Sequence, residues 1–144
     1  MSDHNVPSLS TLVQRFFLEH LGKHRAVSAQ TVAAYRDTLR LLLDFASKRL
    51  RRTPSAITLL EFDAPLLLAF LDYLEKERGN SARSRNARLA AIRTFLKYAG
   101  HHDVDALTTI ERALAIPLKR FDRPMVGFLS RDEFEYEKAK LLRR

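Results

Sequence analysis

The chain contains no cysteine, so neither disulfide bonds nor thiolate metal sites can contribute to it. Glycine and proline are scarce, with four and five residues in 144, and they fall between periodic segments rather than inside them. The longest apolar runs, such as residues 64–71, are far too short to cross a membrane. The N-terminus lacks the apolar region of a secretory signal. These absences indicate a helical, cytoplasmic chain without membrane contact.

Positive charge is in excess. Lysine and arginine number 25 against 17 acidic residues, which gives a net charge of +8 and a pI near 10.2. This balance is typical of a nucleic-acid binder, although a soluble basic domain would show it too. With 46% apolar residues, a chain of this length can bury one core. We therefore expect one compact domain with tails.

Apolar residues recur at steps of three and four along most of the chain and predict five helices. Ser28, Asp63 and Ser81 are placed as N-caps, and glycines end several of the segments. The expected fold is all-α, a compact bundle of four to five helices. The expected helices span residues 8–22, 28–49, 63–79, 81–100 and 105–115.

The two ends of the chain show a different pattern. Residues 1–7 are expected to be a flexible N-terminus, and residues 8–116 to form the helical domain. Residues 117–129 contain two prolines and one glycine and show no helical period, which predicts an extended linker. Ser130 and Glu133 form a capping box that predicts a final helix over residues 131–144. That helix is too short to be a domain of its own.

Residues 81–98 form the most informative segment. It is expected to be helical and carries five basic side chains and no acidic one: Arg83, Arg85, Arg88, Arg93 and Lys97. Basic residues one helical turn apart repel one another, so such a helix indicates a nearby polyanion. Residues 61–78, in contrast, carry five acids and two bases. One side of the bundle should therefore be positive, and DNA is the first partner to consider.

The order and spacing of residue types across the chain carry a family resemblance. The pattern begins in the second expected helix, continues through a leucine-rich third helix into the fourth, and ends with residues 128–133. The residues that form the pattern are Ser28, Thr31, Tyr35, Leu39, Leu43, Phe45, Ser81, Ser84, Asn86, Arg88, Leu89, Ala91, Ile92, Arg93, Phe95 and Tyr98. This pattern resembles the N-terminal core-binding domain of the tyrosine recombinases, the phage integrase and Xer-type family.

The resemblance implies a SAM-like bundle that grips one face of a recombination half-site on double-stranded DNA. In this reading, the helices at 28–49 and 81–98 cross the major groove, and residues 130–144 begin a truncated catalytic domain. It further implies a nucleoid-associated protein that meets other recombinase subunits in a synaptic complex when full length. The parent protein would cleave and rejoin DNA through a tyrosine.

Polar, amide-bearing and basic side chains near the starts of these two helices can bond phosphates or base edges. Simpler roles stay open for several of them: Ser28 and Ser81 as caps alone, Arg85 as the partner of an acid on the third helix, and Arg93 and Lys97 as solubilising charges. Tyr35 is expected at the core boundary. The predicted DNA-binding residues are Ser28, Gln30, Thr31, Arg36, Ser81, Arg83, Ser84, Arg85, Asn86, Arg88, Arg93 and Lys97.

Catalysis by this chain is not expected. None of its five histidines is followed by arginine at the family's His-x-x-Arg spacing, and no tyrosine follows a catalytic constellation. His20 and His24 have a spacing that could bind a metal, but Gly22 lies between them and surface histidines explain them better. No catalytic residue, metal or cofactor is therefore predicted. The alternative function is a helical protein-interaction module whose basic face binds an acidic partner.

Overall fold

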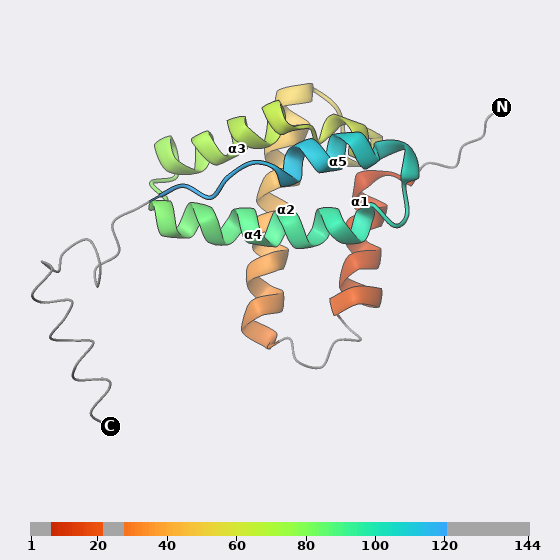
Figure 1. The fold of residues 1–144 in the computed structure, drawn as a ribbon, viewed down its shortest axis with the longest axis horizontal. Helices are drawn as coiled ribbons and strands as arrows, with labels where there is room; N and C mark the ends of the chain where they lie inside the picture. Colours follow the sequence, from red (N-terminus) through yellow and green to blue (C-terminus); the bar gives the residue numbers. More distant parts are fainter. Residues whose placement is uncertain (1–6, 22–27, 121–144) are drawn as a thin grey trace, which may run out of the picture.

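The computed structural model describes residues 7–21 and 28–120, and these residues form helices and no strand. The α-helices are α1 (Leu9–Arg15), α2 (Ala29–Leu50), α3 (Ala64–Lys76), α4 (Ala82–Ala99) and α5 (Leu107–Leu114). A π-helical turn, η1 (Phe16–Leu21), continues α1, and short 3-10 turns precede α3 and α5. The all-α fold class is confirmed (Figure 1).

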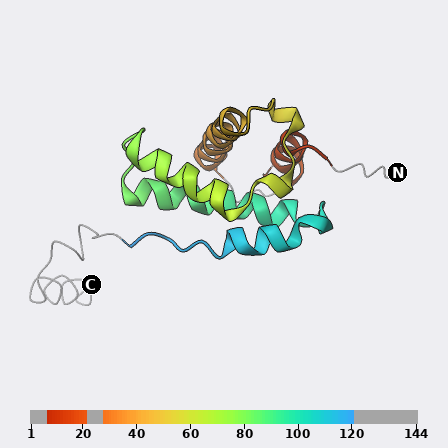
Figure 2. The same ribbon diagram turned by 90° about the horizontal axis from the view of Figure 1, so that it is seen from above.

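The helices form two antiparallel pairs that cross. In Figure 1, α1 and α2 run vertically, whereas α3 and α4 run horizontally across them. Figure 2 shows α1 and α2 end-on, on one side of the α3 and α4 pair, with α5 on the opposite side. Residues 116–120 continue from α5 toward the beginning of α4. We call residues 116–120 the C-terminal strap.

Side-chain caps start three of the helices as predicted. The Ser28 hydroxyl accepts a hydrogen bond from the Thr31 N–H at 3.1 Å, and the Ser81 hydroxyl accepts one from the Ser84 N–H at 3.1 Å. The Asp63 carboxylate accepts one from the Leu66 N–H at 3.0 Å. Each such cap stabilises the fold by about 1 kcal/mol. The caps fix where α2 and α4 begin.

The core is built around α4, which contacts α2, α3, α5 and η1. The apolar stripe of α4 is buried, and so is that of α3. The stripe residues are Leu89, Ile92, Phe95, Leu96 and Ala99 of α4 and Leu66, Leu67, Phe70, Leu71 and Leu74 of α3. Gly79 adopts φ +67° in the turn between α3 and α4, a left-handed conformation that glycine reaches without a steric cost. This turn sends α4 back along α3.

The first helix differs from the prediction because its geometry changes at Phe16. The apolar spacing predicted one continuous α-helix, but η1 is a π-helix. Phe16 and Leu21 are both buried although they are five positions apart, and this spacing matches the wider π-helical turn. Apolar residues at steps of three and four do not reveal such a change in helical pitch.

Short 3-10 turns connect several of the helices. Between α2 and α3, residues 54–56 and 59–61 form such turns, and Ile57, Leu59 and Phe62 of this connection are buried in the core. The fifth helix is shorter than predicted because residues 104–106 form a 3-10 turn before α5 begins. The cap of α5 is the apolar Ala106, which offers no side-chain acceptor.

Three predictions fall wholly or mostly outside the described residues. These are the flexible N-terminus over residues 1–7, the part of the linker beyond residue 120, and the final helix over residues 131–144. Residues 117–120, the described part of the expected linker, form no helix, and Lys119 is bonded to Asn86 of α4. Across the described ranges, no helix is both long and apolar enough to span a membrane.

Candidate nucleic-acid interface

The solvent face of α4 presents two bases separated by short side chains. Arg83 and Lys97 are exposed, and Ala87, Ala90 and Thr94 lie between them on the same helical face. The Thr94 hydroxyl donates to the Ala90 carbonyl at 3.1 Å, which keeps that side chain close to the helix. Within the described ranges, Arg83 and Lys97 make no ion pair. We call these five residues the α4 face.

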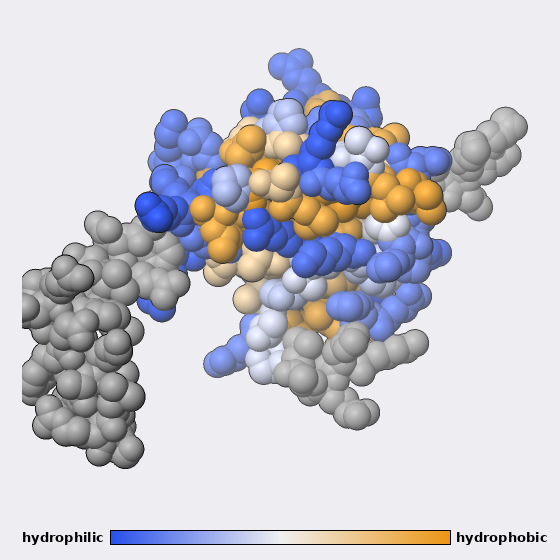
Figure 3. Space-filling model, in the orientation of Figure 1, coloured by the Kyte–Doolittle hydropathy of each residue, from blue (hydrophilic) through white to orange (hydrophobic). Residues whose placement is uncertain are grey.

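A notch lies beside this face, where α2 crosses α4, and its volume is about 360 Å³. It is lined by Thr31, Ala34, Tyr35, Asp37 and Thr38 of α2 and by Ser84, Ala87, Arg88 and Ala91 of α4. Ser28 and Gln30, at the start of α2, are exposed. Figure 3 shows pale side chains of intermediate hydropathy where the lower part of α2 meets α4.

Arg88 joins α2 and α4 from within the crossing. Its guanidinium donates to the Asp37 carboxylate at 3.1 Å, to the Thr38 hydroxyl at 3.0 Å and to the Asn80 side chain at 3.2 Å. Only 22% of its side chain is exposed. These bonds use donors on all three guanidinium nitrogens, so Arg88 holds the two helices together.

Arg85 pairs with an acid of α3, as the alternative reading of the sequence proposed. Its Nε lies 3.5 Å from a Glu75 carboxylate oxygen, and its side chain is 11% exposed. The ion pairs of Arg85 with Glu75 and of Arg88 with Asp37 correct one argument drawn from the sequence. The basic helix was expected to need an outside polyanion to offset repulsion, but Glu75 and Asp37 offset part of it within the domain.

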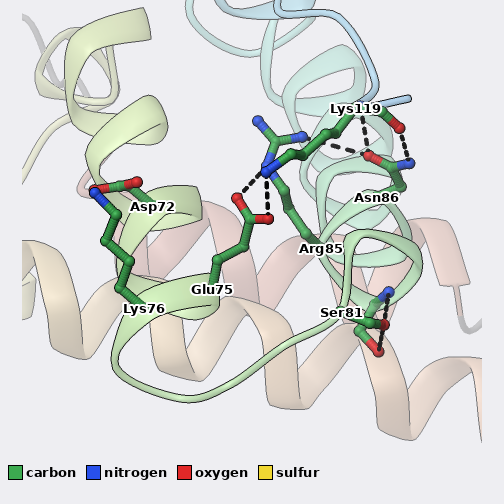
Figure 4. A network of polar contacts seen from close by, with 8 residues as sticks. Asp72, Glu75, Lys76, Ser81, Arg85, Asn86 and Lys119 are labelled. Atoms are coloured by element: carbon green, nitrogen blue, oxygen red, sulfur yellow. Dashed lines mark hydrogen bonds and ion pairs between the residues drawn. The ribbon is translucent and has the colours of Figure 1, made fainter. Parts of the chain in front are cut away.

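Asn86 and Arg93 face the C-terminal strap. The Asn86 amide bonds both backbone groups of Lys119, and the Arg93 guanidinium donates to the Ile116 carbonyl. Figure 4 shows Asn86 and Arg85 beside Lys119, with Glu75 reaching them from α3. In the structure, both predicted DNA-binding residues therefore bond to protein groups.

Arg36 lies on a different side of α2. Its guanidinium is stacked 5.5 Å from the centre of the Phe17 ring. Together with Arg40, it borders a groove between α1 and α2, whereas Thr31 and Tyr35 line the notch toward α4. The structure thus separates Arg36 from the α4 face and from the first turn of α2.

The sequence missed a cluster around Tyr98 that attaches η1 to α4. The Tyr98 hydroxyl donates to the Glu19 carboxylate at 2.8 Å, and its ring contacts those of Phe16, His20 and His102. Burial raises the pKa of Tyr98 to about 12, and the hydrogen bond and negative charge of Glu19 act in the same direction. Glu19 and Tyr98 are 79 residues apart, so no local pattern reveals the pair.

Metal binding finds no support in the described residues, which contain no group of three or more histidines, cysteines or carboxylates able to hold a metal ion. The ring of His20 stacks on that of Phe16 at 5.3 Å. Its predicted spacing partner, His24, lies outside the described residues.

Comparison with known proteins agrees with this architecture. The phage integrase N-terminal SAM-like domain matches residues 14–103. The chain is 49% identical over 128 residues to the Sinorhizobium fredii protein named "Putative integrase/recombinase y4rC", covering 89% of this chain and 39% of that protein. It is 42% identical over 135 residues to "Putative integrase/recombinase y4rD" of the same organism, covering 94% and 47%.

A further relative is the tyrosine recombinase XerD of Bifidobacterium longum, 37% identical over 91 residues, which cover 62% of this chain and 28% of that protein. No solved structure matches the chain. The chain thus spans less than half the length of the curated relatives it matches. The five-helix bundle and the match over residues 14–103 show that the chain belongs to the phage integrase N-terminal SAM-like domain family, the core-binding domain of tyrosine recombinases.

Proposed function

We propose that this domain grips a recombination half-site on double-stranded DNA through the α4 face and the first turn of α2. The observation that carries the proposal is the pair Arg83 and Lys97, which flank short side chains on α4 without an ion pair inside the described ranges. Family membership supports a role in DNA recombination.

The dimensions of the α4 face support this role. Lys97 is fourteen positions after Arg83 in α4, so the two residues lie about 21 Å apart along the helix axis at a rise of about 1.5 Å per residue. A major groove is about 12 Å wide and admits an α-helix. The two bases can therefore reach phosphates on either side of the groove, while the short side chains between them allow the helix backbone to approach the bases.

The first turn of α2 supplies the uncharged contacts. Ser28 and Gln30 are exposed at the start of α2, and Thr31 lines the notch that Ser84 borders from α4. Hydroxyl and amide groups bond phosphates as well as base edges, so they can position the domain and contribute to sequence readout. Ser28 still caps α2, and its hydroxyl donates to the Thr31 hydroxyl at 3.0 Å, which leaves one lone pair of the Ser28 oxygen to accept a further hydrogen bond.

Arg88 and Arg85 are proposed to support DNA binding without contacting the DNA. Arg88 fixes the crossing of α2 and α4 through Asp37 and Thr38, and Arg85 ties α4 to α3 through Glu75. Arg88 thereby keeps the two proposed DNA-contacting segments at a constant relative position, and Arg85 holds α4 on α3. Loss of either arginine should therefore lower the stability of the fold without removing a direct phosphate contact.

Cleavage and rejoining of DNA are proposed to belong to the parent recombinase and not to this domain. The match covers only the N-terminal family domain, and the relatives extend over more than twice the length that is aligned. Within such a protein, the domain would hold the duplex while other residues supply the tyrosine nucleophile and the phosphate-stabilising groups.

Fluorescence anisotropy with a labelled duplex tests DNA binding against the alternative protein-interaction function. At physiological salt we expect non-specific dissociation constants of about 10⁻⁴ to 10⁻⁶ M, with steep weakening as salt rises. Unlabelled duplex should displace the probe, whereas polyglutamate at the same charge concentration should displace it far less. Failure to bind any duplex at 50 mM salt would refute the proposal, and equal competition by polyglutamate would favour an acidic protein partner.

A further inference from the structure

The C-terminal strap is held against the domain by a closed ring of polar contacts. The Asn86 Nδ2 donates to the Lys119 carbonyl at 2.8 Å, and the Lys119 N–H donates to the Asn86 Oδ1 at 2.8 Å. The Lys119 ammonium lies 2.6 Å from a Glu75 carboxylate oxygen. Arg85 completes the ring, 3.5 Å from Glu75 and 3.4 Å from the Asn86 oxygen (Figure 4).

The Asn86 amide forms the same pair of hydrogen bonds with the Lys119 backbone that a neighbouring β-strand residue would form. A carboxamide has one donating and one accepting group side by side, which matches the N–H and C=O of a single extended residue. Only one orientation of the amide satisfies both groups of Lys119, so the network itself assigns its oxygen and nitrogen. The contact fixes the backbone of Lys119 regardless of its side chain.

A second attachment lies three residues earlier. Ile116 is 5% exposed, and its carbonyl accepts a hydrogen bond from Arg93. Lys119 is thus held at its backbone and its side chain, while Ile116 is held by burial. Pro117 lies between them and restricts the backbone further, since its φ angle is fixed by the ring. The strap is therefore defined at both of its ends.

We propose that Asn86 and Glu75 form a latch that sets the place and direction in which the chain leaves this domain. The latch holds Lys119 against Asn86, near the beginning of α4, where the strap ends (Figure 1). Any polypeptide that continues from there starts near the N-terminal end of α4, the helix proposed to contact DNA. Asn86 is thus a positioning residue, and this consequence for DNA rests on the proposed function.

Hydrogen exchange of the Lys119 amide tests the latch without DNA. In the native chain, the bond to the Asn86 oxygen should protect this amide. Asn86→Ala removes both backbone bonds and should speed its exchange by roughly tenfold or more. Glu75→Ala should speed it less, because the Asn86 contacts remain. Gln14→Ala, which removes an amide from an exposed position of α1, is the matched control and should have no effect.

A spin label tests the direction of the strap. The chain has no cysteine, so Arg120→Cys creates a single attachment point for a nitroxide. The label should broaden the amide signals of residues 81–86 in the native background, and Asn86→Ala should largely remove that broadening. The latch is refuted if Asn86→Ala keeps native helicity while both the Lys119 protection and the broadening stay unchanged.

Duplex binding separates this inference from the proposed function. Asn86→Ala should bind a labelled duplex within about twofold of the native affinity, because its amide serves the strap and not a phosphate. A large loss of affinity with unchanged Lys119 protection would overturn the latch and assign Asn86 to DNA. If the native chain binds no duplex, the proposed function falls, and hydrogen exchange still decides whether the latch exists.

Discussion

Removal of the two bases on the α4 face should change how DNA binding depends on salt. Arg83 and Lys97 are exposed and make no ion pair inside the described ranges, so Arg83→Ala with Lys97→Ala should leave the fold intact. Each phosphate contact contributes about 0.9 to the slope of log affinity against log salt. Loss of two contacts should therefore flatten the slope by about 1.8.

The change in slope predicts a difference in duplex affinity that can be measured directly. Between 50 and 200 mM salt, a slope difference of 1.8 corresponds to a factor of about 12. The native chain should lose about 12 times more affinity over this range than the double variant does. Anisotropy titration with one labelled duplex at several salt concentrations gives both slopes, and circular dichroism verifies that helicity is unchanged.

The matched control removes the same number of charges elsewhere. Lys76 on α3 and Arg112 on α5 are exposed, and their replacement by alanine takes two positive charges from the same net +8. Because charges beyond about 10 Å are largely screened at 0.1 M salt, this variant should keep the native slope. Equal flattening in both double variants would show that net charge, and not the α4 face, governs binding.

Three further changes test the framework of the site. Arg88→Ala should lower the free energy of unfolding in urea by about 2 kcal/mol, since it breaks charged hydrogen bonds to Asp37 and its neighbours. Asp63→Ala should cost about 1 kcal/mol in the same assay by removing the α3 cap. Tyr98→Phe should cost about 1 kcal/mol at neutral pH through loss of the Glu19 bond. Since the folded pKa of Tyr98 is raised from 10.0 to about 12, native stability should fall as pH rises through this window, and the phenylalanine variant should fall less.

The sequence predicted the parts of this fold that depend on neighbouring residues. The caps Ser28, Asp63 and Ser81 each bond an amide three residues later, and this spacing is visible in the sequence. The apolar stripe of α4 was likewise readable from steps of three and four, and its residues are buried. Local periodicity and capping chemistry were sufficient for these features.

The partners of the basic residues could not be predicted in the same way. Arg88 meets Asp37 across 51 positions, and Asn86 meets Lys119 across 33. These contacts depend on how α2 and the strap cross α4, which no local pattern encodes. The sequence identified the basic helix correctly, but only the packing distinguishes Arg83 and Lys97, which face solvent, from Arg85 and Arg88, which face acids.

Chemical-shift mapping during titration with a short duplex tests the central claim most directly. At low salt, the largest amide shifts should occur at residues 28–31, 83–87 and 94–97, with little change on α3 and on the exposed side of α5. That pattern would locate DNA on the α4 face and the first turn of α2. Shifts concentrated on α5 or in the groove between α1 and α2, or no shifts at all, would contradict the account.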